Sequence, residues 1–339
     1  MPLQPSTDGF RPSRRSADIR ALPADVLVHI LSLLDGPTLA SATSASSYLH
    51  SLSQPLWREL SNVTWPSTTD PRVSCVLSAS FPDAFHSLFS DAFPRLCSIP
   101  PPLFAPCAPT DRLLSAVDLH RGGNLIFSRL VETETRSGWF LSSPFRIDAL
   151  DSNESPHAAK AASSSPAVKS VEGELTLSWV VINPASGRAA DFSSRRPVSV
   201  QRHWLSGEIQ VRFATVLNRF PAGSSEAEPV QVGILVTCEG GEEHVREVSL
   251  QVEDLEGTSL NGRDSLVVLQ GAMEGHRGKK RETKEEEEGE RQRYLEFLER
   301  KRLKKEKKMR NEGRLDMACV LIGVPIFAAF WAFVIVMLC

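Results

Sequence analysis

Apolar residues recur with a helical period near the start of the chain. Val26, Ile30 and Leu34 stand four residues apart, and Leu27 and Leu31 lie beside them. Residues three and four apart share one face of a helix, so this spacing predicts a helix with a broad apolar face. Such a face has to be covered, either by the rest of the chain or by another protein.

Turn signals divide the following region into further short helices. Gly36 ends the first helix, and Pro37 suits the first turn of the next. We expect helices over 38–45 and 46–53, with another beginning at Pro55. About 40 residues cannot bury this much leucine and isoleucine by themselves. Periodicity alone leaves open whether the remaining apolar surface meets the downstream chain or a partner.

Phenylalanines at helical spacing predict one more helix. Phe81, Phe85 and Phe89 recur every four residues, which indicates the inner face of a helix over 82–92. Consecutive prolines at 100–102 then interrupt regular structure. We expect a boundary here between a helical part and a part rich in strands.

Downstream of Leu113 the period changes from helical to alternating. Apolar and polar residues alternate strictly over 208–213, which indicates a strand with one wet face. Roughly seven or eight short strands with polar turns predict an antiparallel, β-sandwich-like body. A loop rich in Ser, Ala and Pro, 151–170, interrupts it. The expected strands cover 124–131, 138–147, 174–181, 207–216, 230–238, 245–253 and 265–270.

The last 23 residues, Met317 to Cys339, contain no charged side chain. At 1.5 Å per residue such a helix spans about 34 Å, more than the roughly 30 Å of a bilayer's hydrocarbon core. A buried soluble helix is the alternative, but such a helix normally has a polar face. Nine Lys and Arg from Arg300 to Arg314 precede the segment. They predict a single-pass C-terminal anchor with the bulk of the chain in the cytosol, and they suit anionic lipid headgroups.

A charged segment precedes this anchor. From Lys279 to Arg314 there are 15 basic and 10 acidic residues, a balance of +5, while the remaining 23 basic and 31 acidic residues give −8. Pairs at i, i+4 such as Glu296 with Arg300 predict a solvated helical stalk over 276–314. The opposite end, 1–18, is rich in Pro, Ser and Arg and has no apolar run. We expect it to be disordered and not a secretory signal peptide.

The sequence offers no constellation for catalysis. Six cysteines and eight histidines are dispersed, without the spacing of a zinc site or a disulfide framework. There is no Gly-rich phosphate loop, no GxSxG elbow and no HExxH pair. A net charge of −3 gives no footprint for nucleic acid. We therefore expect a protein that is not an enzyme, with reduced thiols and with no cofactor or metal.

One basic cluster next to an aromatic residue lies within the predicted body. It consists of Arg195, Arg196, Arg202, His203 and Trp204. Arginines can pair with the carboxylates or phosphates of a partner, so this cluster predicts recognition of an acidic or phosphorylated client segment. Solvated arginines at strand ends are the alternative interpretation.

The first helices resemble an F-box. That family opens with Leu-Pro, continues with an apolar pattern ending in Ile-Leu-x-x-Leu, and closes with a Leu-Trp pair. The resemblance implies a three-helix unit that docks on the Skp adaptor of a cullin–RING ubiquitin ligase. The matching residues are Leu22, Pro23, Leu27, Ile30, Leu31, Leu34, Leu39, Leu52, Leu56 and Trp57.

The resemblance also implies which residues contact the adaptor. These are Leu22, Pro23, Leu27, Ile30, Leu31, Leu34 and Trp57. The third helix departs from the family, because Ala45-Ser46 and Leu49 stand where Val-Ser and Trp are often found. Smaller side chains bury less apolar area, at about 25 cal/mol per Å². We therefore expect weaker adaptor binding than is usual for the family.

Similarity to a plant family of F-box proteins extends beyond this unit. The segments from Thr64 to Pro71, TWPSTTDP, and from Ser193 to Trp204 are similar to that family, some members of which also end in an apolar segment. This resemblance implies a membrane-tethered adaptor that recruits an unidentified client for ubiquitination. The alternative is a membrane-anchored protein whose sandwich binds a carbohydrate or a lipid headgroup, with a degenerate F-box.

The expected organisation is α+β with several domains. Each boundary follows a change in periodicity, composition or charge along the chain. The parts are a disordered tail 1–18, an F-box 19–62, a helical and Pro-rich bridge 63–112, a β-rich client-binding domain 113–275, a charged stalk 276–314 and a transmembrane helix 317–339.

Overall fold

The computed structural model describes residues 22–94, 96, 110–151, 173–220, 226–239, 244–275 and 283–338. The chain divides into two compact units, the first ending at Leu60 and the second beginning at Ser61. The tail 1–18, the prolines at 100–102 and all of the loop 151–170 except its first residue lie outside the described residues.

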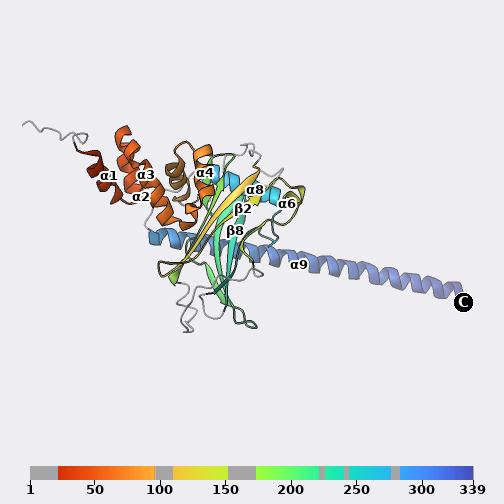
Figure 1. Cartoon of the computed structure of the whole chain (residues 1–339). Coiled ribbons are helices and arrows are strands. Elements are labelled where there is room, and N and C mark those ends of the chain that lie inside the picture. The colour runs from red at the N-terminus through yellow and green to blue at the C-terminus, as the bar shows by residue number, and fades with distance from the viewer. Residues whose placement is uncertain are drawn as a thin grey trace, which may run out of the picture. The chain divides into compact units, whose positions relative to one another are not determined.

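Helices form the described part of the first unit (Figure 1). The first begins directly after Pro23, whose carbonyl accepts the N–H groups of Val26 and Leu27 at 3.1 and 3.2 Å. The Asp35 carboxylate caps the second by accepting the Thr38 N–H at 3.2 Å. Both helices lie where the sequence predicts them. The helices are α1 (Ala24–Ser32), α2 (Gly36–Ser44) and α3 (Ser47–Thr64), whose last turn extends into the second unit.

The third helix corrects an expectation about Pro55. The sequence predicts separate helices on either side of this proline, whereas α3 runs through it. A proline inside a helix removes a backbone donor and costs about 3 kcal/mol. Ser53 and Trp57 are buried on the two sides of Pro55, and the Trp57 Nε1–H donates to the Ser53 hydroxyl oxygen at 3.2 Å. Burial of this continuous face stabilises the helix against the lost hydrogen bond.

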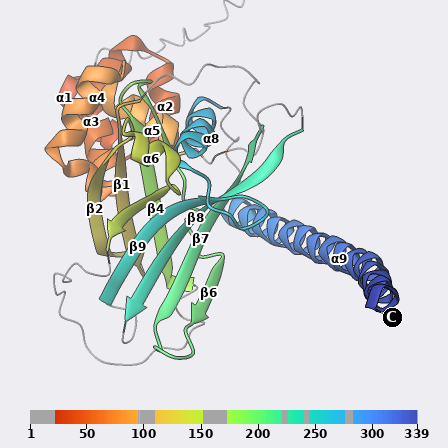
Figure 2. The same cartoon turned by 90° about the vertical axis from the view of Figure 1, so that its right-hand side faces the viewer.

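The strands of the second unit form two antiparallel sheets (Figure 2). The first has strand order β2-β1-β4-β5 and the second β3-β9-β8-β7-β6. The antiparallel pairing predicted from the alternating pattern is confirmed. The strands are β1 (Arg112–Arg121), β2 (Asn124–Glu134), β3 (Arg146–Leu150), β4 (Leu175–Asn183), β5 (Arg188–Asp191), β6 (Ser199–Arg202), β7 (Ile209–Arg219), β8 (Glu228–Glu239) and β9 (His244–Glu253).

The two sheets share one hydrophobic core. Leu113, Val117 and Leu119 of β1 belong to the same buried cluster as Val211 and Phe213 of β7. Alternate residues of a strand point to the same face, so each sheet turns one face toward this core. A strand with only one face toward the core alternates apolar and polar residues, so the sequence predicts such strands most clearly.

Helices of the second unit pack against the strands. The segment η2 contacts β1 and β2, and α5 contacts β5. The helix expected over 82–92 is confirmed as α5, which buries Phe85 and Phe89. The helices of this unit are η2, a 3-10 helix (Pro66–Thr69), α4 (Pro71–Ser80), α5 (Ala84–Ala92), α6 (Gly138–Ser142), α8 (Gly262–Glu274) and α9 (Thr283–Leu338).

Two expected strands are wrong. The segment 138–147 forms α6 and only then enters β3, and 265–270 lies inside α8. Helix α8 buries Leu266, Leu269 and Met273 at helical spacing. Short apolar runs suit a buried strand and a buried helix equally well, so packing decides between them. The pattern also fails to reveal β1, which is buried on both faces and so does not alternate, and the four-residue strands β5 and β6.

Helix α9 joins the expected stalk and the expected membrane segment into one continuous helix (Figure 1). The expectation that the stalk is solvated is wrong for its first part. Tyr294 and Phe297 of α9 are buried, and α9 contacts β7. The Lys301 Nζ lies 3.2 Å from a carboxylate oxygen of Glu253 at the end of β9. Residues 276–282 of the expected stalk lie outside the described residues.

Candidate partner-binding surfaces

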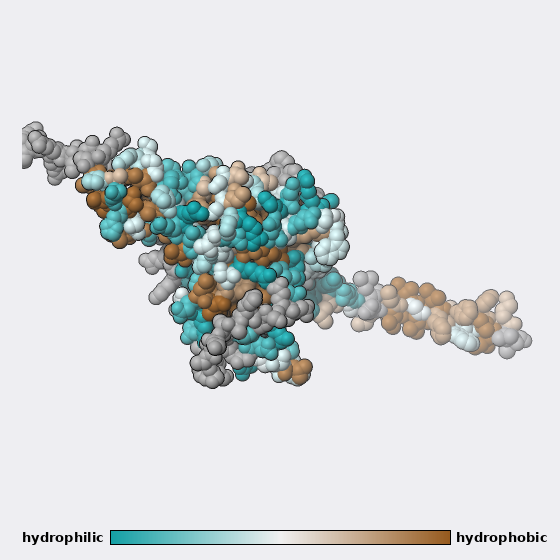
Figure 3. Space-filling view, viewed as in Figure 1, coloured by the Kyte–Doolittle hydropathy of each residue, from teal (hydrophilic) through white to brown (hydrophobic). Residues whose placement is uncertain are grey.

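An apolar ridge stays exposed on α1. It consists of Leu22, Val26, Ile30 and Leu33, here called the α1 ridge. At about 100° per residue, Val26, Ile30 and Leu33 fall within about 60° of one another around the helix. Ile30 is 46% exposed and Leu33 is 74% exposed, and Figure 3 shows apolar side chains gathered over α1. A contiguous apolar patch of this kind marks a site of protein interaction.

A different stripe of α1 is buried. Leu27 and Leu31 are buried, as are Leu39 of α2 and both Leu49 and Trp57 of α3. Full burial of each such side chain stabilises the fold by roughly 1.5–3 kcal/mol. The family often has Trp at the position of Leu49. Because Leu49 is buried, its smaller side chain changes the packing inside the helical unit and leaves the exposed α1 ridge intact.

The seven predicted adaptor contacts therefore divide by burial. Leu22, Pro23 and Ile30 are exposed and Leu34 is half-buried, whereas Leu27, Leu31 and Trp57 are buried. The buried three offer no surface to a partner in this structure, because the helical period turns them inward. Val26 and Leu33 share the ridge but are missing from the predicted set. The spacing of Val26 to Ile30, one helical turn, is the signal that identifies Val26 from sequence.

Ser67 of the segment TWPSTTDP takes part in an internal contact with the first sheet. Ser67 of η2 donates its backbone N–H to Asp118 Oδ1 at 2.9 Å and its hydroxyl to Asp118 Oδ2 at 2.6 Å. Ser128 donates its hydroxyl to Asp118 Oδ1 at 2.6 Å. Burial raises the pKa of the Asp118 carboxyl, and the hydrogen bonds from Ser128 and Ser67 act against that rise. This Asp118 clasp fixes η2 on the first sheet.

The two neighbouring arginines of the predicted client patch differ in what they contact. Arg195 is exposed and has a φ of +58°, a left-handed conformation that is uncommon for residues other than glycine. Arg196 donates from Nη1 to the Gly173 carbonyl at 2.5 Å, and its Nε lies 3.5 Å from a Glu287 carboxylate oxygen on α9. Arg196 therefore helps to hold α9 on the body.

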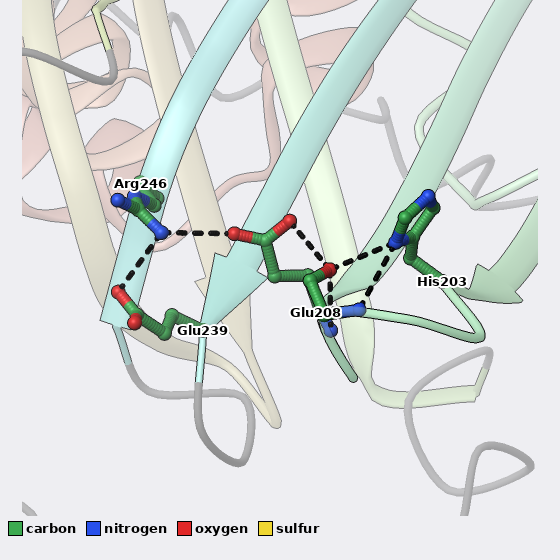
Figure 4. A network of polar contacts seen from close by, with 5 residues as sticks. His203, Glu208, Glu239 and Arg246 are labelled. Carbon is green, nitrogen blue, oxygen red and sulfur yellow. Dashed lines mark hydrogen bonds and ion pairs between the residues drawn. The ribbon is translucent and has the colours of Figure 1, made fainter.

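Of the other three residues of the predicted patch, Arg202 ends β6, and His203 and Trp204 lie between β6 and β7. Arg202, His203 and Trp204 are all exposed, and Trp204 is 87% exposed. The His203 ring nitrogen Nδ1 lies 3.0 Å from the Ser206 hydroxyl oxygen, which donates to Glu208 Oε2 at 2.9 Å (Figure 4). These contacts order the turn around an exposed tryptophan.

The predicted patch is not one cluster. Arg195 and Arg196 precede β6, whereas Arg202 is its last residue. Four residues of strand extend about 13 Å. The arginine pair and the aromatic turn therefore lie at opposite ends of β6, and recognition of a client by these residues stays a prediction.

The C-terminal part of α9 is apolar on several sides. Val320, Ile322, Phe327, Phe330 and Trp331 are each more than half exposed, and their positions are distributed around the helix. Figure 3 shows the apolar surface along this end of α9. Among the described residues, α9 is the one helix whose length and composition suffice to cross a membrane.

The described residues hold no candidate metal centre. No three His, Cys, Asp or Glu side chains in the ranges that the structure describes lie close enough together to hold a metal ion. Cys75 and Cys319 are free thiols.

A helical unit with an exposed apolar ridge, joined to a body of antiparallel sheets, defines an α+β protein built to bind partners. Residues 19–62 match the F-box-like family model. Similar proteins of Arabidopsis thaliana match nearly the whole chain. F-box protein At2g27310 is 40% identical (94% of this chain, 96% of that protein), Probable F-box protein At2g36090 is 42% identical (94% of each), and F-box protein At3g44326 is 38% identical (98% and 93%).

The chain belongs to the F-box protein family. No solved structure matches it. F-box proteins generally act as substrate adaptors of Skp–cullin–F-box ubiquitin ligases, are typically not catalytic, and bind a Skp-type adaptor through the F-box. The F-box predicted from the Leu-Pro and Ile-Leu-x-x-Leu pattern is thus confirmed.

Proposed function

We propose that this protein recruits a client protein to a Skp–cullin–F-box ubiquitin ligase and is tethered to a membrane. The F-box, 19–62, binds the Skp-type adaptor, and cullin through it. The exposed α1 ridge carries this proposal. Leu22, Val26, Ile30 and Leu33 give the apolar contact, with Pro23 and Leu34 at its margin.

The β-rich domain, 113–275, takes the client in this proposal. Its two sheets bury their inner faces in a shared core, and α9 covers part of the second sheet. The turns between strands remain for recognition, in line with the general tendency of binding residues to lie on loops held by a rigid scaffold. In this proposal the bridge, 63–112, connects the two binding parts along the chain, and the Asp118 clasp fixes its segment η2 on the first sheet.

The membrane segment, 317–339, anchors the protein as a single-pass helix in this proposal. Its support is the absence of charge over 23 residues and the exposure of its apolar side chains in the described part. The Lys and Arg from Arg300 to Arg314 stay on the cytosolic side, where anionic lipids attract them. The F-box and the β-rich domain then face the cytosol, where ubiquitin ligases act.

The test replaces one ridge residue with a charge. Ile30→Asp places a carboxylate in the centre of the α1 ridge, and burying it against an adaptor is costly. We expect co-purification of the Skp-type adaptor with the full chain to fall about tenfold or more. The matched control is Val267→Asp, at a 53% exposed apolar position of α8. Both variants should keep the thermal unfolding midpoint of the wild type.

Two outcomes contradict the proposal. Adaptor binding that survives Ile30→Asp excludes the α1 ridge as the contact. Adaptor binding that is absent even from the wild-type chain excludes the ligase role and favours the membrane-anchored protein with a degenerate F-box, whose sandwich binds a carbohydrate or a lipid headgroup.

A further inference from the structure

Two large apolar side chains project from the turn between β6 and β7. Trp204 is 87% exposed and Leu205 is 74% exposed. The turn, residues 202–208, is here called the β6–β7 finger. Aromatic anchors that insert into a pocket dominate the energy of protein interfaces. The exposed Trp-Leu pair is therefore a candidate anchor for a partner.

Hydrogen bonds hold the finger in one conformation. The His203 N–H donates to the Glu208 carbonyl at 2.8 Å, and the Gly207 N–H donates to the His203 carbonyl at 2.9 Å. The Ser206 N–H donates to the His203 Nδ1 at 3.2 Å. Gly207 has a φ of +73°, which a residue without Cβ adopts at low cost. The backbone that carries Trp204 is thus ordered before any partner binds.

Ion pairs fasten the finger to the sheet (Figure 4). Glu208 Oε1 lies 2.9 Å from Arg246 Nη1 of β9, and the same nitrogen lies 3.5 Å from a Glu239 carboxylate oxygen of β8. Charged residues of β8 and β9 therefore hold the finger in place through Glu208. A braced turn loses little conformational entropy when it binds, so its apolar side chains contribute most of their burial energy to affinity.

The position of the finger favours a protein over the bilayer. The finger leads into Ile209, which pairs with Cys238, and Cys238 pairs with Val245 near the start of β9. The ion pair between Lys301 of α9 and β9 lies at Glu253. Val245 and Glu253 are eight positions apart along β9, a distance of about 26 Å. The finger thus lies at the opposite end of the sheet from the place where α9 leaves toward the apolar segment.

Charge narrows the kind of protein that fits. Arg202 is exposed beside Trp204, and within the described ranges its side chain makes no hydrogen bond or ion pair. Arg246, in contrast, is shared by two carboxylates. A carboxylate on the partner would pair with Arg202 while Trp204 fills an apolar pocket.

We propose that the β6–β7 finger is the client-recognition element. Trp204 and Leu205 insert into an apolar pocket of a cytosolic protein, and carboxylates on the rim of that pocket face Arg202. This inference rests on the proposed function, because it names the site through which the adaptor holds its client. It assigns no client contact to Arg196, which pairs with Glu287 of α9.

The first experiment compares Trp204→Ala with a matched control in plant cells. Both variants and the wild type are expressed as full-length chains fused to a proximity-labelling enzyme. The control is Trp139→Ala, at a tryptophan of α6 that is 79% exposed. We expect a set of proteins to lose about tenfold or more of its labelling with Trp204→Ala and to keep it with Trp139→Ala. Equal labelling by the wild type and Trp204→Ala overturns the proposal.

The second experiment tests the charge at the rim. Arg202→Glu should reduce the labelling of the same set. In a labelled protein, replacing the rim carboxylates with lysine should restore binding to Arg202→Glu and weaken binding to the wild type. If no such reversal restores binding, the acidic rim is wrong and the proposal falls.

The third experiment asks whether the finger touches lipid instead. Full-length wild type and Trp204→Phe are placed in nanodiscs that contain phosphatidylserine with brominated acyl chains. The difference between their fluorescence emission reports Trp204. We expect no quenching of this difference by the brominated lipid, and strong quenching would assign the finger to the bilayer. Adaptor co-purification, which Trp204→Ala should leave unchanged, separates failure of this inference from failure of the ligase role.

Discussion

The Asp118 clasp gives a stability prediction whose size follows from its hydrogen bonds. Asp118→Ala leaves the Ser67 N–H and the Ser67 hydroxyl without an acceptor inside the protein. Ser128 is exposed, so its hydroxyl can turn to water. An unsatisfied buried donor costs about 1–3 kcal/mol, and removal of the buried carboxylate offsets part of the total. We expect the free energy of unfolding to fall by about 2–4 kcal/mol.

The pH dependence of stability separates the charge of Asp118 from its hydrogen bonds. Burial raises the pKa of this carboxyl, so the folded protein holds the proton more tightly than the unfolded chain does. The resulting stabilisation is fully present below the pKa of Asp118 in the unfolded chain and is lost as pH rises through its higher pKa in the folded protein. Asp118→Asn keeps an acceptor for Ser67 and has no titrating group. It should remove this part of the pH dependence and cost less than alanine.

The assay is thermal unfolding of the full chain in detergent, followed by tryptophan fluorescence between pH 4 and 8. Ser128→Ala is the control, because it removes only the exposed donor and should cost below about 1 kcal/mol. Equal destabilisation by Asp118→Ala and Ser128→Ala would show that the Ser67 hydrogen bonds to Asp118 do not stabilise the fold. A pH dependence that persists in Asp118→Asn would show that Asp118 is not the titrating group.

Three further predictions concern the helices. Leu31→Ala should lower the free energy of unfolding of the F-box by about 2–5 kcal/mol. Ile30→Ala should lower it by less than about 1 kcal/mol but should weaken adaptor binding. Chemical denaturation measures the free energy of unfolding, and co-purification measures adaptor binding. Phe297→Ala should release the first part of α9 from β7 and speed the hydrogen exchange of that part of α9. Leu298 is exposed, so Leu298→Ala should have neither effect. A stop codon after Arg314 should move the protein from the membrane fraction that resists alkaline extraction to the soluble fraction. Continued retention in the membrane fraction would falsify the proposed C-terminal anchor.

Local patterns predict most helices of the F-box and most strands of the body. The i, i+4 spacing of Val26 and Ile30 is enough to place α1, and strict alternation over 208–213 is enough to place β7. Both signals are local, because each depends on one face of one element. They fail where an element is short or is buried on both faces. They also fail at 138–147 and 265–270, whose short apolar runs suit a strand or a helix: 138–142 forms α6, and 265–270 lies inside α8.

The candidate surfaces were harder to predict than the elements. Two apolar stripes on α1 look alike in sequence, but only the one with Leu27 and Leu31 is buried. The five residues of the client patch are close in sequence, yet Arg196 pairs with α9 while Trp204 projects from a turn. Residues that are close in sequence need not share a surface, because the two ends of a four-residue strand already lie about 13 Å apart.

By itself, the sequence determined the F-box pattern, the antiparallel class of the body and the uncharged C-terminal segment, since each depends on the spacing or composition of neighbouring residues. Only the tertiary structure decided which apolar stripe remains exposed, that Ser67 reaches Asp118, and that Phe297 is buried on a helix that contacts β7. These outcomes join residues far apart in the chain. Their free energy comes from contacts that form only once the sheets and helices have assembled.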